Sequence, residues 1–134
     1  MKKITFQGEY GAYSHLACTE AFSDLEPIPC RTFESALGSV RAGDSDLAMI
    51  PVENSVAGRV ADIHYLLGDY DLKIYSEHFQ KVEHQLLVKS GVNLKEVKCV
   101  RSHSMAIGQC QSVIKELGLQ TIVMADTAGS AKYI

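Results

Sequence analysis

Hydrophobic residues in this chain recur with two different periods, which predicts short strands separated by helices. Short apolar runs typical of strands occupy residues 3–6, 47–52, 97–100 and 121–125. Between these runs the apolar residues recur at i, i+3, i+4 and i+7, the spacing of a helix with one buried face. This alternation is typical of βαβ units, so the sequence predicts an α/β fold with mostly parallel sheets. We expect the most apolar run, 47–52, to be central in its sheet.

Proline and capping residues refine the first half of the chain. Pro27 and Pro29 cannot donate to a strand ladder, so residues 27–31 are predicted to form an edge strand. Thr32 is predicted to cap the next helix, which ends at Gly43. The stripe that this helix should bury is Phe33, Ala36, Leu37 and Val40. Further helices are expected at residues 14–23 and 61–67.

An extended stretch, residues 72–89, separates these elements from a second set. The second set is predicted as a strand at 97–100, a helix at 104–117 that Gly118 terminates, a strand at 121–125 and a helix capped by Asp126-Thr127. The longer helix should bury Ile107, Cys110, Val113, Ile114 and Leu117. We therefore predict two α/β lobes, residues 1–76 and 77–134, with a cleft between them.

Composition excludes several classes of protein. The 134 residues are 46% hydrophobic and 22% charged, which is close to the globular average and argues against disorder. No apolar run approaches the ~20 residues of a membrane helix, and polar residues interrupt any signal peptide that Lys2-Lys3 would open. A cytoplasmic location is therefore expected. The net charge is −3 and no basic run exceeds Lys2-Lys3, so neither a nucleic acid nor a membrane is an expected partner.

The cysteines and histidines do not indicate a metal or redox centre. Neither residue type shows a metal-ligand or CxxC spacing, so we expect reduced thiols and no metal. Thiol chemistry at Cys18 or Cys110 is an alternative, although neither has a cationic neighbour in the sequence to activate it.

Three segments share a layout that suits ligand binding. In residues 6–14, 50–59 and 100–109 an apolar strand ends, a polar or glycine-containing loop follows, and a helix starts. Open α/β sheets bind ligands beyond the carboxyl ends of their strands, where loop amides and helix N-termini present N–H donors. Such donors favour anions, so a small carboxylate or phosphate is the predicted ligand.

The first two loops differ in how strongly they indicate a binding site. The glycine spacing in residues 8–14 fits neither a dinucleotide motif nor a phosphate loop, and Ser14 can equally be a helix cap. The second loop places a carboxylate, an amide and a hydroxyl together at Glu53, Asn54 and Ser55. A cap by Asn54 or Ser55 would explain one of these polar residues but not three, so we favour a binding site.

The third loop contains Ser102, His103 and Ser104 before a helix. Either serine can cap that helix, and a lone histidine without a neighbouring nucleophile is more often structural. Gln109 lies on the side of the same helix opposite Ile107, so its amide is not committed to the buried stripe.

Taken together, these segments resemble the catalytic domain of prephenate dehydratases. The matching segments are Phe6–Ser14, Ile50–Gly58, Ser102–Cys110 and Asp126–Ala131, in this order and over almost the whole chain. The resemblance implies a two-lobed fold like the type II periplasmic binding proteins, with an active-site cleft between mixed, mostly parallel sheets. Both lobes would be incomplete here, the first lacking its return strand.

The resemblance also implies a carbon–oxygen lyase reaction without a cofactor. Prephenate loses its ring hydroxyl as water and its ring carboxylate as carbon dioxide, which gives phenylpyruvate on the route to phenylalanine. Related enzymes convert arogenate directly to phenylalanine, and the quoted segments do not distinguish the two substrates. A non-catalytic module of the same fold that binds a small carboxylate is a third interpretation.

The resemblance places Glu53, Asn54, Ser55 and Gln109 in the cleft. We assign Glu53, Asn54 and Gln109 to catalysis. Substrate binding is assigned to Ser55 and, from the loops and helix starts, to Ser14, Ser102, His103 and Thr127. Glu53 would either hold a neighbouring side chain or act as an acid, and helix starts near Ser14, Ser104 and Thr127 would supply donors to the dianionic substrate.

Two departures from the family pattern affect the expected activity. The Thr-Arg-Phe motif, whose threonine is credited in the family with protonating the leaving hydroxyl, has no counterpart before Ile134. Ser104-Met105 stands where family members often have Pro-Gln. We therefore expect a fragment with weak or no activity alone, and a homodimer that covers the unfinished sheet.

Overall fold

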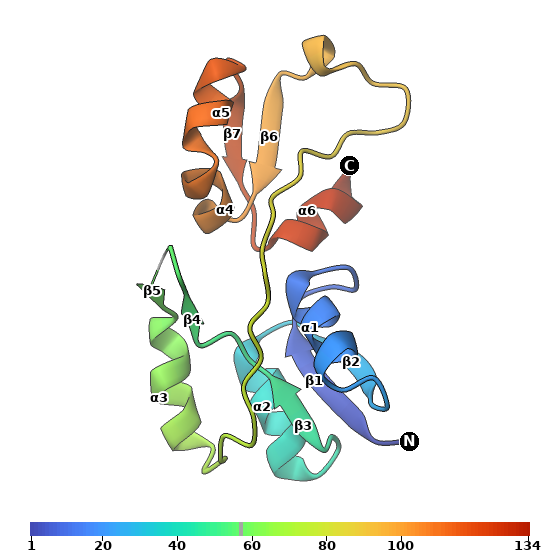
Figure 1. Cartoon of the computed structure of the whole chain (residues 1–134), viewed down its shortest axis with the longest axis vertical. Coiled ribbons are helices and arrows are strands. Elements are labelled where there is room, and N and C mark those ends of the chain that lie inside the picture. The colour runs from blue at the N-terminus through green and yellow to red at the C-terminus, as the bar shows by residue number, and fades with distance from the viewer. Residues whose placement is uncertain (57) are drawn as a thin grey trace. The chain divides into compact units, whose positions relative to one another are not determined.

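The computed structural model describes residues 1–56 and 58–134, so Ala57 of the second family-like segment lies outside the described residues. The chain divides into two compact units, Met1–Lys81 and Val82–Ile134, and each is an α/β structure (Figure 1). The division falls within the predicted extended stretch, where residues 72–89 form neither helix nor strand. No helix in the described part of the chain has the length and apolar content needed to cross a membrane.

The first unit is built on a three-stranded parallel sheet with the order β2-β1-β3. Its strands are β1 (Lys3–Gln7), β2 (Glu26–Cys30) and β3 (Leu47–Met49). The central strand β1 carries Ile4, Thr5 and Phe6, all buried, and the Thr5 hydroxyl donates to the Ala36 carbonyl oxygen at 3.0 Å. The predicted edge position of the proline-containing strand is confirmed.

One prediction for this sheet is wrong. The run 47–52 was expected to be central, but β3 has three residues and lies at the edge of the sheet. The strand is short because Pro51 has no N–H to donate and restricts the backbone of Ile50 before it. The apolar run alone therefore predicted a strand that is too long and wrongly placed in the centre of the sheet.

Two helices pack against β1, and they begin by different means. Helix α2 (Phe33–Ala42) starts with the predicted cap, a capping box in which Thr32 and Ser35 satisfy each other's backbone N–H groups, and ends at Gly43 with φ 82°. Ala36 and Leu37 of its predicted stripe are buried. Helix α1 (Tyr13–Ala21) begins after Ala12 without a side-chain cap, so the interpretation of Ser14 as a cap is wrong.

A short hairpin and a helix complete the first unit. Strands β4 (Glu53–Asn54) and β5 (Gly58–Arg59) pair antiparallel, and helix α3 (Ala61–Asp69) follows. The predicted helix at 61–67 is confirmed, and Ile63 in it is fully buried. Arg41 of α2 donates to the Asp69 carbonyl oxygen at 3.2 Å, which links the end of α3 to α2.

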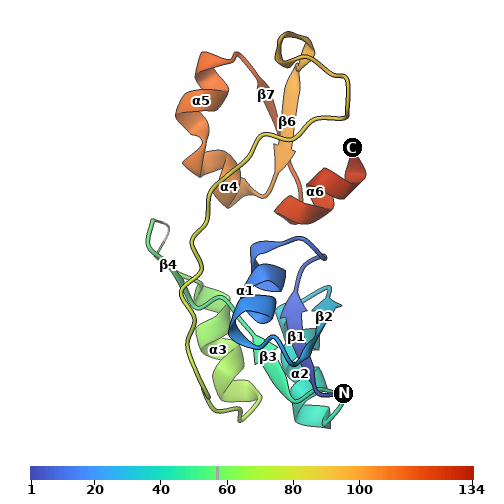
Figure 2. The same ribbon diagram turned by 45° about the vertical axis from the view of Figure 1, so that its right-hand side comes forward.

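The second unit has a two-stranded parallel sheet, β6 (Cys99–Ser102) and β7 (Gln120–Val123). Its helices are a short 3-10 helix η1 (Leu94–Glu96) and the helices α4 (Ser104–Gln109), α5 (Gln111–Glu116) and α6 (Thr127–Tyr133), which Figure 2 shows around the sheet. Gly118, with φ 66°, ends α5 as predicted.

The predicted single helix over 104–117 is wrong, because Cys110 leaves the helical conformation with φ −102° and ψ 11°. The break follows Gly108, a poor helix former, and it changes which residues face inward. Ile107 and Ile114 of the predicted stripe are buried and Cys110 is half-buried, whereas Val113 is 54% and Leu117 38% exposed.

Candidate functional site

In the first unit, two of the family-like segments leave the same end of the sheet. Strands β1 and β3 are adjacent and parallel, with Phe6 paired to Met49. The loop after β1, Gly8–Ala12, and the segment after β3, Ile50–Val52, therefore start from neighbouring carboxyl ends. This agrees with the predicted placement of these two loops.

A cluster of three rings fixes the first loop. The Phe6 and His15 rings stack with their centroids 5.6 Å apart, and Tyr10 contacts both edge-on at 6.2 and 5.2 Å. The N–H of Gly11 donates to His15 Nδ1 at 3.1 Å, so in this arrangement the neutral imidazole carries its proton on Nε2. Gly11 adopts φ 91°, a conformation that disfavours other residues.

The sequence interpretation missed the role of His15 in this loop. The signal available was its spacing of four residues from Gly11, which lets a side chain in the first helical turn reach back to the preceding loop. Ser14, beside it, is half-buried in the first turn of α1.

The polar residues of the second loop lie on the β4–β5 hairpin. Asn54 is half-buried and its Oδ1 accepts from the Val56 N–H at 2.9 Å, while Glu53 and Ser55 are exposed. Glu53 is paired in register with Arg59, which puts a carboxylate and a guanidinium on facing positions. The interpretation of Asn54 or Ser55 as a helix cap is wrong, because α3 starts after Val60 without a side-chain cap.

In the second unit, the helix that follows the third loop is capped by His103, which the sequence did not indicate as a cap. His103 precedes α4, and its Nδ1 accepts from the Met105 N–H at 3.1 Å. Neither Ser102 nor Ser104 performs this role, so both serine-cap predictions are wrong. Ser102 closes β6 and is half-buried, and Ser104 is exposed.

Helices α4 and α6 start from the same end of the β6–β7 sheet (Figure 2). Ser102 pairs with Val123, and the Met124 N–H donates to the Ser102 carbonyl oxygen at 2.8 Å. Asp126 caps α6, as predicted, by accepting from the Gly129 N–H, and Thr127 is exposed at the first position of the helix. Ser102, His103 and Thr127 therefore come from one end of this sheet.

Gln109 ends helix α4, and its side chain has a partner that the sequence did not suggest. The Gln109 Oε1 lies 2.6 Å from Nε2 of His84, which belongs to the extended stretch. Gln109 is half-buried, whereas Ile107 in the same helix is buried. No periodicity connects residues 25 positions apart, so this pair could not be found from the sequence.

The predicted site residues thus form one set in each unit. The first unit contains Ser14, Glu53, Asn54 and Ser55, and the second contains Ser102, His103, Gln109 and Thr127. One site that uses both sets stays a prediction.

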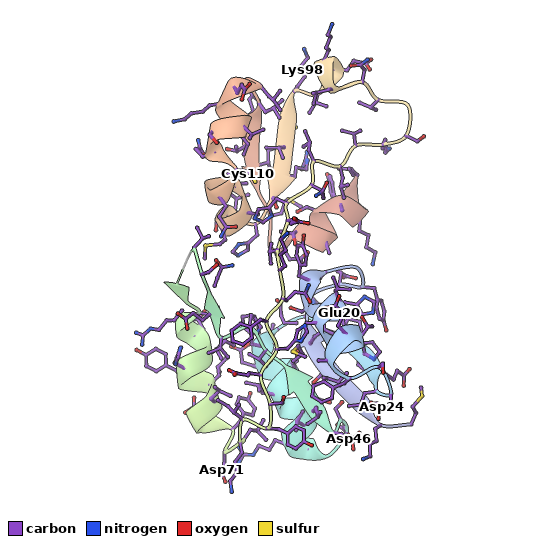
Figure 3. All side chains as sticks on the ribbon, viewed as in Figure 1. Glu20, Asp24, Asp46, Asp71, Lys98 and Cys110 are labelled. Carbon is purple, nitrogen blue, oxygen red and sulfur yellow. The ribbon has the colours of Figure 1, made fainter. Side chains whose placement is uncertain are left out.

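A pocket of about 260 Å³ in the first unit involves none of these residues. Its lining consists of Lys2, Phe22, Asp24, Leu25, Asp46, Leu47 and Tyr75, and Figure 3 labels Asp24 and Asp46. Lys2 and Asp46 directly precede β1 and β3, so this pocket lies at the amino end of the sheet. The loops described above leave the opposite, carboxyl end.

The thiol alternative is contradicted for Cys18. This residue is fully buried, and burial raises the pKa of its thiol to about 12. Burial also raises the pKa of Cys30, against a smaller opposing effect of a hydrogen bond with Ser35. Thiols of this kind are protonated near neutral pH and are poor nucleophiles. Among the described residues, no three His, Cys, Asp or Glu side chains gather where they could hold a metal ion.

Comparison with protein families identifies the family to which this chain belongs. The family model for prephenate dehydratase matches residues 4–134. This chain belongs to the prephenate dehydratase family. The match contains all four segments on which the resemblance rested, and it extends over both units.

Curated relatives in this family are longer than the chain. A bifunctional N-acyl-homoserine lactone acylase/prephenate dehydratase of Komagataeibacter europaeus is 46% identical over 131 residues, which cover 98% of this chain and 47% of the relative. Arogenate dehydratase/prephenate dehydratase 1, chloroplastic, of Arabidopsis thaliana is 40% identical over 132 residues, covering 98% of this chain and 34% of the relative. The chain therefore spans between a third and a half of their lengths.

A solved relative confirms the fold class. The prephenate dehydratase from Arthrobacter aurescens, in complex with L-Phe, superposes with a TM-score of 0.73 at 28% identity, covering 97% of this chain and 44% of that one. The α/β fold with mostly parallel sheets is thus shared with a known prephenate dehydratase.

Proposed function

We propose that this chain provides substrate-binding and catalytic residues for the conversion of prephenate to phenylpyruvate. The observation that carries the proposal is the family match over residues 4–134, within which every predicted site residue falls. Arogenate is the alternative substrate, since relatives named for both substrates match nearly the whole chain.

The chemistry suits the groups that the chain offers. Prephenate is a dianion, and aromatisation drives loss of water and carbon dioxide once the leaving hydroxyl is protonated. The amides of Asn54 and Gln109 and the hydroxyl of Ser55 are donors of the kind that orient carboxylates without adding charge. Because Glu53 faces Arg59 across the hairpin, we favour the role in which Glu53 holds a neighbouring cation.

The proton donor for the leaving hydroxyl is the one group that we cannot assign by resemblance. Thr-Arg-Phe has no counterpart among the 134 residues, and the similar Arg31-Thr32-Phe33 is accounted for by the Thr32 cap of α2. A homodimer and a cytoplasmic location stay predictions.

The first experiment separates catalysis from binding. The 134-residue chain is incubated with prephenate and, separately, with arogenate, and formation of phenylpyruvate or phenylalanine is followed by absorbance and chromatography. Product formation supports the proposal, and the better substrate distinguishes the two dehydratase activities. Phenylpyruvate binding without product formation would instead support the carboxylate-binding module.

A matched pair of variants tests the site. Asn54→Ala should weaken phenylpyruvate binding by about 1–2 kcal/mol if the amide donates to a ligand carboxylate. Asn93→Ala is the control, because Asn93 caps η1 and is not among the predicted site residues. Unchanged affinity in Asn54→Ala would remove Asn54 from the site.

A second activity is favoured by one specific similarity. The relative at 46% identity is named as an N-acyl-homoserine lactone acylase as well as a prephenate dehydratase. We propose testing hydrolysis of an N-acyl-homoserine lactone by the same chain, with release of homoserine lactone as the readout. Its absence would leave the dehydratase proposal untouched.

A further inference from the structure

The contact between His84 and Gln109 joins two parts of the second unit that are 25 positions apart in the sequence. Gln109 is the last residue of α4, and His84 lies in the stretch without helix or strand. The backbone of Gln109 is anchored by its neighbours, since Ala106 and Ile107 are each only 9% exposed and the Cys110 N–H donates to the Ala106 carbonyl oxygen at 3.1 Å. The 2.6 Å contact with His84 fixes the other end of the side chain.

The proton position on His84 decides which end of the Gln109 amide faces outward. With the proton on Nε2, the imidazole donates to Oε1, and both N–H groups of the amide are left to donate to a ligand. With the proton on Nδ1, Nε2 is an acceptor, so the amide must turn its NH₂ group to the imidazole and its carbonyl oxygen away. A carboxylate ligand is attracted by the first arrangement and repelled by the second.

We propose that His84 is a positioning residue that holds the Gln109 amide with its NH₂ group directed to a carboxylate of the substrate. The proposal rests on the proposed function, because a dianionic substrate is what makes a donor at Gln109 useful. His84 does not need to touch the substrate. Its role is to donate one hydrogen bond from Nε2–H to Gln109 Oε1 and to accept none from the Gln109 NH₂ group.

The experiment uses the full 134-residue chain labelled with ¹⁵N. The ring nitrogens of His84 report the tautomer by NMR, and phenylpyruvate is added as the probe while the Gln109 side-chain NH₂ signals are followed. We expect the Nε2–H tautomer in the unaltered chain, a mixture of tautomers in Gln109→Leu, and a shift of the Gln109 NH₂ signals when phenylpyruvate binds.

Three variants separate positioning from a general structural role. His84→Gln retains a donor at a similar reach and should bind phenylpyruvate within about threefold of the unaltered chain, whereas His84→Leu should bind about tenfold more weakly. Gln109→Glu keeps an acceptor for His84 but loses both N–H donors, so it should weaken binding by at least about tenfold. Backbone NMR spectra check that each variant is folded, and His84 is exposed, which favours retention of the fold.

An Nδ1–H tautomer, or a His84→Leu variant that binds like the unaltered chain, would overturn the proposal. Failure of the proposed function gives a different pattern. Absent turnover of prephenate, with the tautomer and the binding ratios as expected, leaves the role of His84 standing and favours the non-catalytic carboxylate-binding module over a dehydratase. Absent binding of phenylpyruvate by the unaltered chain overturns both, because Gln109 then has no carboxylate to meet.

Discussion

The two units follow the same strand–helix pattern but bury their apolar residues to different extents. In the first unit β1 has a strand on each side, and Ile4, Phe6, Cys18, Leu37 and Ile63 are almost completely buried. In the second unit, β6 and β7 have only each other in the described part of the chain, and Val123 of β7 is 65% exposed.

The difference shows that periodicity predicts an element more reliably than it predicts burial. A helical stripe is buried only where a neighbouring surface covers it, and a sheet of two strands offers less surface than one of three.

Phe6→Ala should destabilise the first unit by about 3–5 kcal/mol, because the ring is fully buried in the central strand. Urea unfolding, followed through NMR signals from each unit, measures the free energy of unfolding of the first unit separately from that of the second. The control Phe79→Ala removes a ring that is 87% exposed and should change stability by less than about 0.5 kcal/mol. Equal losses in the two variants would contradict the burial assigned to β1.

Ile114→Ala should destabilise the second unit by about 2 kcal/mol, the low end for a buried isoleucine, because the unit is small. The adjacent Val113→Ala should cost less than about 0.5 kcal/mol if the break at Cys110 turns Val113 outward. The same unfolding measurement applies. Similar losses of stability in both variants would indicate a continuous helix over 104–117 that buries Val113 as well as Ile114.

Alkaline pH should weaken the first unit through Cys18. The thiol pKa is about 12 in the folded chain against an ordinary value of 9.0, so above pH 9 the unfolded state loses a proton that the folded state keeps. Stability is therefore fully present below about pH 9 and falls as pH rises toward 12, by at most about 1.4 kcal/mol per pH unit.

The slope of unfolding free energy against pH, measured in Cys18→Ala, tests this effect independently of the cavity that the substitution leaves. The slope should be smaller than in the unaltered chain, with a remainder from Cys30, whose pKa is also raised. Cys99→Ala in the second unit is the control. An unchanged slope in Cys18→Ala would contradict burial of the thiol.

The smallest expected effect concerns how the two helices of the first unit begin. Thr32→Ala removes the capping box of α2 and should cost about 1 kcal/mol. Ser14→Ala in α1 should cost less than about 0.5 kcal/mol, because α1 has no side-chain cap. A large loss of stability in Ser14→Ala would restore the capping role for Ser14.

Local signals in the sequence predicted most of the fold. The cap at Thr32, the terminators Gly43 and Gly118 and the edge position of the Pro27–Pro29 strand depend on neighbouring residues alone, and the structure confirms them. The break at Cys110 was missed because the apolar spacing continues across it.

The candidate site was harder to anticipate than the fold. The Asn54 hairpin was missed because two-residue strands carry no periodicity, and the His103 cap was missed because histidine is not a favoured capping residue. Pairs such as His84 and Gln109 depend on how the extended stretch folds back, which no local pattern encodes.

The prolines of β2 have a consequence for association. The Glu26 N–H donates to Lys2 and the Cys30 carbonyl accepts from Gly8, so residues 26, 28 and 30 face β1 and the two proline nitrogens face outward. An incoming strand would find no donors at either proline. The loss of these donors disfavours strand addition on this flank, and open-ended fibril-like growth needs both flanks, so we expect an added strand to join beside β3.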